Sequence, residues 1–305
     1  MNTTVATERI GELERVSLKV DRHFDVGKIF DCGQCFRFDK VEDSSHGVEY
    51  SGVAFGRVVS FAQDGDILYI YNSTEDDFDR IWRKYLCLDV DYEKINDSLL
   101  SRFSDKRNEA FERAVEMGRG IRILSQDHAE TVISFIISQN NNIPRIKQII
   151  ERLSSLCGTP IPVCEEMKKH LSGRSSLCSF PSVAALNALG VDGLFAAKLG
   201  FRAKYVYDAT EKMLSGEIDL DRLNELKNTT EGLEYLCKIK GVGPKVASCI
   251  LLFCAERYDA FPVDVWIKKA MEKYFGGEAS FYDLFGSYAG IAQQYLFYYE
   301  RYLVE

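Results

Sequence analysis

Residues 236–253 read LCKIKGVGPKVASCILLF, and this stretch decides the fold of the C-terminal part of the chain. Apolar residues lead into a Gly-Val-Gly turn, and an apolar run with helical spacing follows it. Gly241 and Gly243 allow a tight turn and bring backbone N–H groups close to another surface with no Cβ in the way. N–H groups at a helix start suit a phosphate. The pattern predicts a helix–hairpin–helix, although a plain corner that needs the glycines only for its bend fits the same letters.

Lys245 favours a chemical role for this hairpin. It falls in the first turn of the helix that follows, where the helix dipole disfavours a cation and a solvated lysine gains nothing. The position favours a neutral amine, and a neutral amine is a nucleophile. Lys245 is therefore a candidate catalytic residue.

Asp264 stands directly before an amphipathic helix in AFPVDVWIKKAMEKYF, residues 260–275. The position is that of a natural N-cap, and capping alone would explain an aspartate there. Paired with Lys245, the carboxylate would also stabilise a reacting centre that develops positive charge, such as a sugar losing its base. The sequence leaves both interpretations open.

The remaining pattern predicts an α+β protein with two domains. Residues 48–73 alternate aromatic and β-branched residues and break at Gly56-Arg57 and Asp64-Gly65, which predicts an antiparallel meander. Residues 75–86 then read as a helix, with acids in its first turn. We expect a domain of antiparallel sheet plus helix over 1–110. A helical domain over 111–305 would hold two helical subdomains and the hairpin at about 232–254.

Composition and charge limit the classes of function. The net charge is −8, but residues 41–100 carry 13 acidic and 5 basic side chains, and the rest of the chain is balanced. That remainder is free to carry a basic face. The sequence shows neither a signal peptide nor an apolar run of membrane-spanning length, so we expect a soluble, non-exported protein.

Nine cysteines in a chain of this kind predict reduced and mostly buried thiols. The segment DCGQCFRF, residues 31–38, contains a C-x-x-C, which raises a redox centre as an alternative. It runs toward a strand meander instead of opening a helix, so the thioredoxin-like context is missing. His23, Cys32, Cys35 and His46 could in principle surround one zinc ion, but no second ligand pair supports a metal site.

Six segments make the chain resemble a known family, the helix–hairpin–helix DNA glycosylases, and among them the 8-oxoguanine DNA glycosylase/AP lyases. They are CGQCFRF, GIRILSQDHAETVISFIISQNNNIPRI, LGFRAKYV, LCKIKGVGPKVASC, PVDVW and GSYAGIAQQYLF. The resemblance implies a TATA-binding-protein-like sheet domain followed by a mostly α-helical glycosylase domain. It also implies that Lys245 attacks the deoxyribose C1′, expels the base and forms a Schiff base, after which β-elimination nicks the strand. Asp264 assists that chemistry.

The resemblance also implies two groups of recognition residues. Gly33 would meet N7–H of a flipped 8-oxoguanine with its carbonyl, Cys249 and Phe297 would sandwich the base, and Gln293 would bind its Watson–Crick edge. On the other side, Asn140 would fill the gap left by the flipped base, since flipping unstacks it. The remaining contacts to the opposite base and its neighbour are assigned to Arg145, Phe201 and Arg202.

Four positions depart from the family's pattern. A tryptophan, Trp266, stands where a histidine is usual, and Phe201 replaces a tyrosine. Lys240 takes the place of a hairpin proline, and Glu300 lies near a position often held by aspartate. These departures bear on phosphate contacts and on selectivity for the opposite base more than on the reaction.

The resemblance implies no metal or organic cofactor and leaves room for a monovalent or divalent cation at the hairpin. No cysteine follows Cys254, so the iron–sulfur cluster of the endonuclease III group is not expected. The expected partner is double-stranded DNA with 8-oxoguanine opposite cytosine, bound by a monomer without a membrane. Localisation would be cytoplasmic and nucleoid-associated in a prokaryote, or nuclear in a eukaryote.

Two alternatives share the fold. A glycosylase for another damaged base, such as an alkylated base, would have the aspartate but no need of Lys245. A non-catalytic helix–hairpin–helix protein that only binds DNA would lack the Lys245–Asp264 pair. The lysine therefore counts against both.

Overall fold

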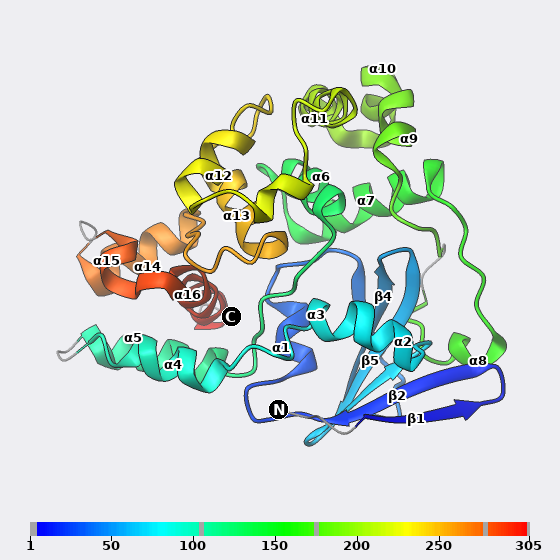
Figure 1. The fold of residues 1–305 in the computed structure, drawn as a ribbon, viewed down its shortest axis with the longest axis horizontal. Coiled ribbons are helices and arrows are strands. Elements are labelled where there is room, and N and C mark those ends of the chain that lie inside the picture. Colours follow the sequence, from blue (N-terminus) through cyan, green and yellow to red (C-terminus); the bar gives the residue numbers. More distant parts are fainter. Residues whose placement is uncertain (1–4, 104–106, 174–176, 277–279, 304–305) are drawn as a thin grey trace.

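The N-terminal part of the chain forms one antiparallel sheet, which Figure 1 shows at the lower right. The computed structural model describes residues 5–103, 107–173, 177–276 and 280–303. The strand order is β1-β2-β6-β5-β4-β3. The strands are β1 (Val5–Ile10), β2 (Leu13–Lys19), β3 (Phe38–Lys40), β4 (Val48–Ala54), β5 (Arg57–Asp64) and β6 (Ile67–Tyr71). The meander predicted for residues 48–73 is confirmed as β4, β5 and β6.

Helices cover one face of this sheet. They are α1 (Val26–Asp31), α2 (Glu75–Asp77), the π-helical turn η1 (Phe78–Trp82) and α3 (Arg83–Tyr85). Phe61 of β5 meets Trp82 edge to face at 5.5 Å, and both side chains are fully buried. On the other face, Met167 of the short helix α8 (Glu165–Lys168) is buried against the sheet. The sheet thus has an apolar layer on each side, as a folded domain of this size requires.

The rest of the chain is helical, and Figure 1 shows its helices in two groups. The upper group holds α6 (His128–Ser138), α7 (Ile143–Cys157), α9 (Val183–Ala188), α10 (Gly190–Leu194), η2 (Phe195–Leu199), η3 (Gly200–Arg202), α11 (Ala203–Ser215), α12 (Thr229–Leu236) and α13 (Pro244–Cys254). The second group holds α4 (Tyr92–Leu100), α5 (Arg107–Gly118), α14 (Val265–Phe275), α15 (Phe281–Phe285) and α16 (Ala289–Leu303). Two short 3-10 turns, η4 (Asp221–Asn224) and η5 (Gly286–Tyr288), complete the helical elements.

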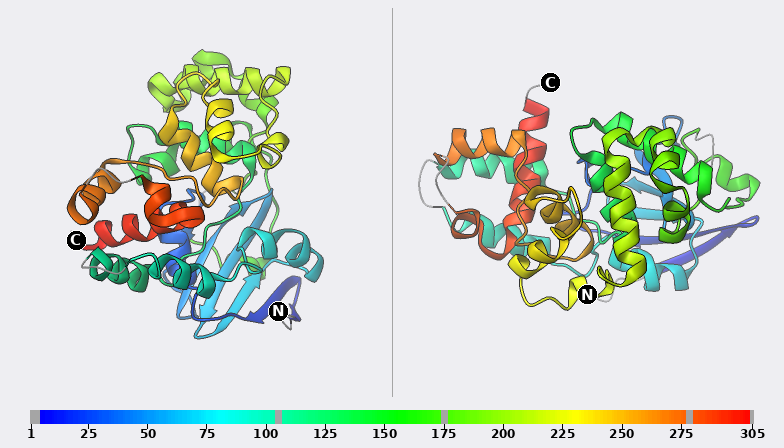
Figure 2. Two further views of the ribbon diagram at one scale, coloured as in Figure 1. Left: turned by 60° about the vertical axis from the view of Figure 1, so that its left-hand side comes forward. Right: turned by 90° about the horizontal axis from the view of Figure 1, so that it is seen from above.

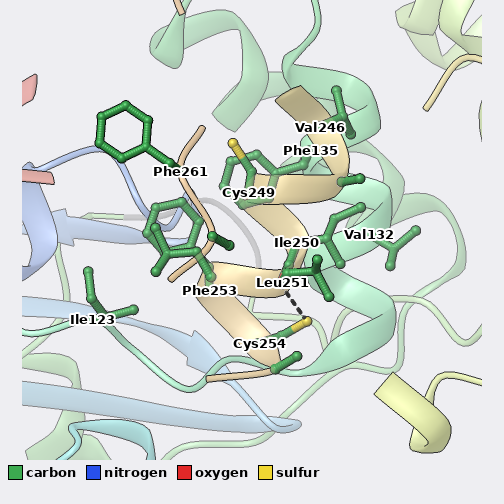
Figure 3. Close-up of a cluster of buried hydrophobic side chains, with 14 of the residues drawn as sticks. Ile123, Val132, Phe135, Val246, Cys249, Ile250, Leu251, Phe253, Cys254 and Phe261 are labelled. Carbon is green, nitrogen blue, oxygen red and sulfur yellow. Dashed lines mark hydrogen bonds between the residues drawn. The ribbon is translucent and has the colours of Figure 1, made fainter. Parts of the chain in front are cut away.

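Helix α13 lies at the centre of the helical core (Figure 3). Its residues from Val246 to Cys254 are all buried, and Phe253 stacks on Phe135 of α6 at 5.3 Å. The helix packs against α6 on one side and α12 on the other. Apolar residues around most of its circumference, as the sequence shows, are what a central helix needs. The first turn of α13 is therefore held on a rigid support.

The seam between sheet and helices is built from polar side chains. Gln34 donates to the carbonyls of Ile29 and Arg122 and accepts from the N–H of Leu124, at 2.8–2.9 Å. Arg122 is buried and donates to the carbonyls of His23 and Cys87. Buried polar groups satisfied in this way fix a geometry closely. The seam holds the loop after α1 at a defined position against the helical part.

Helices α4 and α5 belong to the helical core by their packing. The buried side chains Tyr92, Ile95 and Leu99 of α4 lie in the same apolar cluster as those of α16. Figure 2 shows α5 beside α16 in both further views, and the two helices pack on each other. The domain boundary at residue 110 remains a prediction. Residues of α4, which precede this boundary, nevertheless pack into the core of the helical part. Within the described ranges, no helix is long and apolar enough to cross a membrane.

Candidate active site

A pocket of about 70 Å³ opens between the two helical groups and the loop that follows α1. Six of the residues singled out from the sequence line it: Gly33, Lys245, Cys249, Asp264, Gln293 and Phe297. Residues that lie up to 264 positions apart in the sequence are thus brought to one cavity.

Helix α13 brings Lys245 and Cys249 to the pocket. Lys245 is exposed in the first turn, and Cys249 is buried one turn further along the same face. Burial raises the pKa of the Cys249 thiol, whereas the charge of Lys245 and a hydrogen bond from its side chain oppose that rise. The negative charge of Asp264 adds to the rise of the Cys249 pKa. The three side chains therefore interact electrostatically, as groups around one reacting centre must.

Asp264 is placed for both of the roles that the sequence left open. Its Oδ1 accepts a hydrogen bond of 2.8 Å from the N–H of Ile267, so it is the N-cap of α14. The same side chain lines the pocket beside Lys245. The prediction of a cap is confirmed. The cap also fixes the orientation of the carboxylate, so capping and a catalytic role do not compete.

Helix α16 supplies Gln293 and Phe297, one turn apart on the face toward the pocket. Gln293 is 5% exposed, and among the described residues its Oε1 has no hydrogen-bond partner. A buried carbonyl oxygen without a partner costs about 1–3 kcal/mol, which a bound donor would recover. Gln293 is thus an acceptor aimed into the pocket.

The backbone carbonyls next to Gly33 in the sequence all accept hydrogen bonds from side chains. The Cys32 carbonyl accepts from Gln294 Nε2 at 2.6 Å, and the Gln34 carbonyl accepts from Gln126 Nε2 at 2.8 Å. The carbonyl of Asp31 accepts from Arg301 at 3.1 Å. Among the described residues, the carbonyl of Gly33 has no partner. Gly33 has a φ of +82°, a left-handed conformation that favours glycine.

A second group of residues lies outside this pocket, at the turn between α6 and α7 and at η3. Asn140 has a φ of +48°, which asparagine tolerates better than most residues. Arg202 is buried and donates to the carbonyls of Gln139 and Asn140, so it holds this turn in place. The Arg202 guanidinium lies 4.4 Å from the ring of Phe201, which is 46% exposed. Burial lowers the pKa of Arg202, and the positive charge of Arg145 lowers it further, which places Arg145 in the same group.

The hairpin adopts the geometry that its sequence suggests. Gly243 is the N-cap of α13, and Pro244 occupies the first helical turn. Gly241 has a φ of +79°, and a Cβ there would lie 2.5 Å from the ring of Tyr205 on α11. Gly243 has an ordinary φ of −107°, and nothing lies within 4 Å of the position of its Cβ. The fold therefore requires glycine at position 241. At Gly243 no neighbouring atom would contact a Cβ, so the N-terminus of α13 is accessible there.

The two hairpin glycines are expected to respond differently to alanine. Gly241→Ala places a Cβ in the Tyr205 ring and forces a left-handed alanine, so we expect a loss of about 2–4 kcal/mol of folding stability. Gly243→Ala is expected to leave stability within about 1 kcal/mol. Urea unfolding of both variants checks this. Equal losses would contradict the assignment of strain to Gly241.

The departures from the family's pattern have structural accounts in three places. Trp266 lies under Lys269, whose ammonium is 5.3 Å from the ring. Glu300 is buried and accepts from Tyr274 and Lys273, which ties α16 to α14. The backbone N–H of Lys240 donates to Asp208 at 2.7 Å, a bond that a proline could not make.

The cysteines of the C-x-x-C are packing residues, as expected. Cys32 and Cys35 are buried, and burial raises the pKa of Cys32 to about 12. A reactive thiol needs a lowered pKa, so the buried Cys32 thiol does not fit a redox centre. Within the described residues, no group of three or more His, Cys, Asp and Glu side chains is arranged to hold a metal ion. His23, Cys32, Cys35 and His46, all of which are described, do not form such a group.

Five further residues line the pocket that the sequence did not assign to it: Cys32, Phe135, Phe253, Pro262 and Gln294. Phe135 and Phe253 are buried core residues that also form a wall of the pocket. Their sequence pattern is therefore that of any core residue. Gln294 did leave a signal. Two adjacent glutamines in an apolar helix imply that at least one is buried, and a buried amide needs a partner.

Comparisons with known proteins agree with this geometry. The model of the 8-oxoguanine DNA glycosylase N-terminal domain matches residues 17–132, and that of the HhH-GPD superfamily of base excision DNA repair proteins matches residues 133–281. The N-glycosylase/DNA lyase OGG1 of Arabidopsis thaliana is 31% identical over 293 residues, which cover 88% of this chain and 75% of the relative.

Two solved structures are similar over nearly the whole chain. The 8-oxoguanine glycosylase/lyase of Clostridium acetobutylicum, in complex with double-stranded DNA containing cytosine opposite 8-oxoguanine, is 36% identical with a TM-score of 0.86 and full coverage of both chains. MBOgg1, in complex with a low-affinity DNA ligand, is 39% identical with a TM-score of 0.86 over 99% of this chain and 100% of that one. The chain therefore belongs to the 8-oxoguanine DNA glycosylase/lyase family, within the HhH-GPD superfamily of base excision DNA repair proteins.

Proposed function

We propose that this protein excises 8-oxoguanine from duplex DNA and then nicks the strand, with Lys245 as the nucleophile. Membership of the family supports a bifunctional DNA N-glycosylase/AP lyase. The observation that carries the assignment of residues is the shared pocket of Lys245, Asp264 and Gly33. An amine and a carboxylate that line one pocket are parts that base excision with strand cleavage needs.

The proposed reaction uses groups that the pocket already holds. The neutral amine of Lys245 forms a bond to C1′ as the bond from C1′ to the base breaks, and the electron pair leaves with the base. Ring opening then gives a protonated Schiff base, which acidifies the C2′ proton. Loss of that proton expels the 3′ phosphate by β-elimination, and water releases the enzyme. Asp264 stabilises the positive charge that develops on the sugar in the first step.

Recognition of the lesion follows from the carbonyl of Gly33. N7 of guanine is a hydrogen-bond acceptor, whereas N7 of 8-oxoguanine carries a hydrogen and is a donor. The Gly33 carbonyl, which has no other partner in the described part of the chain, bonds the donor and repels the acceptor. A mismatch of this kind costs about 1–3 kcal/mol. Cys249 and Phe297 lie on either side of the base in this account, and Gln293 binds its Watson–Crick edge.

The second group contacts the opposite strand. In the proposed complex Asn140 fills the gap in the duplex, Arg145 and Arg202 bind the unpaired cytosine, and Phe201 stacks on a neighbouring base. The N–H groups at the start of α13, beside Gly241 and Gly243, bind a phosphate. The protein acts as a monomer, and its chemistry draws on Lys245 and Asp264 without a cofactor.

The alternatives are weaker on the same observations. A protein that only binds DNA has no use for an amine and a carboxylate that line one pocket. A glycosylase for alkylated bases would not need a carbonyl acceptor facing N7. A single-turnover assay decides between these functions. Duplexes with 8-oxoguanine opposite cytosine, with 3-methyladenine, and without a lesion are compared for base release and strand cleavage. Only the first is expected to be cleaved, and cleavage of the second alone would contradict the proposal.

Substitution of Gly33 tests the recognition step. Gly33→Ala is expected to lower the preference for 8-oxoguanine over guanine at least tenfold, with DNA affinity changed by less than about threefold. The added Cβ would lie 3.6 Å from Ile143 and Phe297, so crowding is small, and the strain at φ +82° shifts the carbonyl. Single-turnover excision rates on the two bases measure the ratio.

A matched control variant separates the effect of backbone strain from the effect of the position of Gly33 in the pocket. Gly216 ends α11 with a φ of +78° in open space, so Gly216→Ala introduces the same strain away from the pocket. It is expected to lose similar stability and to keep lesion preference. If both variants discriminate equally well, Gly33 is only a turn residue.

A further inference from the structure

A second hollow, of about 390 Å³, lies beside α7 and outside the lesion pocket. Arg145, Gln148 and Arg152 of α7 line it, together with Lys198 of η2. The three α7 residues follow a spacing of three and then four, which places them on one face of the helix. Their side chains are exposed. One side of this hollow is therefore a straight row of polar and positively charged groups.

The cations of this hollow are not neutralised by acidic side chains. Within the described part of the chain, no carboxylate lies within ion-pair distance of Arg145, Arg152 or Lys198. Arg152 donates from one Nη to the carbonyl of Ala197 at 3.3 Å, which ties α7 to the turn that carries Lys198. Many exposed cations of the sheet domain are paired, for example Lys19 with Asp66 and Arg57 with Asp77. In a chain of net charge −8, an unpaired cluster of this kind produces a local positive potential.

The backbone at Lys198 is strained. Lys198 has φ +72° and ψ 24°, a left-handed conformation inside a helical segment. Glycine adopts this conformation freely, whereas a residue with a Cβ is destabilised by it. Strained residues of this kind persist where the surrounding structure holds them and tend to mark functional sites. Lys198 puts an exposed amine at the edge of the hollow, across from the arginines of α7.

The hollow adjoins the group that faces the strand opposite the lesion. Arg145 lines it and also acts electrostatically on Arg202, which holds the turn at Asn140. We propose that Arg152 and Lys198 bind a backbone phosphate of the undamaged strand, close to the base that lost its partner. The proposal rests on the proposed function, because it takes the strand beside Arg145 to be the undamaged one.

A phosphate is the ligand that this chemistry favours. The guanidinium of Arg152 and the amine of Lys198 lie on different elements. Together they suit an anion with several oxygens better than the hydrogen-bonding edge of a base. A phosphate contact positions the duplex and carries no sequence information, as a repair enzyme that works at any sequence requires. Contacts of this kind would hold the undamaged strand while the damaged nucleotide turns out of the helix.

Salt dependence of binding tests the contact. Lys245→Gln protein serves as the binding-competent background, on a duplex with one 8-oxoguanine opposite cytosine. Lys198→Gly and Arg152→Gln are each expected to reduce the slope of log K against log salt by about 0.9 and to weaken binding roughly eightfold at 0.1 M salt. Lys94→Gln removes one exposed cation of α4, in the other helical group, and is expected to leave the slope unchanged. Unchanged slopes for both hollow variants would overturn the proposal.

Stability provides an independent check on Lys198. Because glycine relieves the left-handed strain, Lys198→Gly is expected to raise the melting temperature by about 2 °C while DNA affinity falls. Opposite signs exclude unfolding as the cause of weaker binding. A lower melting temperature together with weaker binding would contradict the account of this residue.

Uncharged phosphate analogues in the DNA identify the strand that Lys198 contacts. Methylphosphonates are placed one at a time on either strand of the duplex. At one position of the undamaged strand, the methylphosphonate should weaken DNA binding by the Lys245→Gln background protein. The same methylphosphonate should not change DNA binding by the Lys198→Gly variant of that background. Coupling to a phosphate of the damaged strand would overturn the proposal. Failure of the proposed function is distinguishable, since wild type would then release no base while the salt slope on undamaged duplex still reports the contact.

Discussion

Replacing Lys245 with glutamine is expected to slow the release of 8-oxoguanine by about 10⁴-fold or more and to abolish strand cleavage. Glutamine has a similar length but no nucleophilic amine, so no bond to C1′ can form and no Schiff base follows. Lys245 is exposed at the first turn of α13, so the folding stability should change by less than about 1 kcal/mol. Single-turnover excision on a duplex with 8-oxoguanine opposite cytosine measures the effect.

Lys240 offers a matched control for charge. It is exposed in the same hairpin, five residues before Lys245, and its side chain does not line the pocket. Lys240→Gln removes the same charge from the DNA-facing hairpin and is expected to weaken binding by less than about tenfold, with excision from the bound complex unchanged. If the two variants lose excision equally, Lys245 contributes only positive potential, and its role as a nucleophile is wrong.

Replacing Asp264 with asparagine is expected to slow base release by about 10²–10³-fold, with DNA binding largely retained. In the proposed mechanism the carboxylate stabilises positive charge on the sugar, and a neutral amide cannot do so. Asparagine is as good an N-cap as aspartate, so α14 should keep its start and the protein its stability. Excision rates and urea unfolding on the same preparation separate the two effects.

Asp264→Ala completes the comparison. Alanine removes both the charge and the hydrogen bond to the N–H of Ile267, so it should lose about 1 kcal/mol of stability in addition to the activity. If Asp264→Asn is as active as wild type and only Asp264→Ala is impaired, the residue is a cap and nothing more.

Much of the fold follows from local sequence signals. The meander of β4 to β6 alternates apolar residues and turns at Gly56 and Gly65, and both glycines have the positive φ that such turns need. Asp127 and Asn142 are residue types that favour helix N-caps, and each accepts a hydrogen bond from the backbone N–H three residues on. These features are decided within a few residues, which is why they can be predicted.

Other features depend on distant contacts. β1 is mostly exposed and has no apolar face, so its pairing with β2 leaves no pattern in the sequence. Helix α4 could belong to either domain by pattern, and only its packing against the helical core decides. The bonds of Gln34 to Arg122 and Leu124 join residues about 90 positions apart, which no local pattern predicts.

The residues of the candidate site also divide into those that local sequence signals indicated and those that they did not. Lys245 stands out because a cation in the first turn of a helix needs a reason, whereas Cys249 came from the resemblance, with which its helical spacing agrees. Gly33 and Phe297 came only from the resemblance, since a glycine between two cysteines and an aromatic residue in a helix are ordinary in themselves. Lys198 gave no signal, because a left-handed backbone at a lysine is visible only in the structure.

Borohydride trapping tests the central claim, that Lys245 forms a covalent intermediate with the damaged nucleotide, most directly. Wild type, Lys245→Gln and Lys240→Gln are each incubated with a duplex carrying 8-oxoguanine opposite cytosine, and with an undamaged duplex, in the presence of borohydride. We predict a protein–DNA adduct for wild type and Lys240→Gln on the damaged duplex only, with the linkage at Lys245 in the digested adduct. A Lys245→Gln protein that still forms the adduct, or a wild type that releases the base without forming one, would contradict the account.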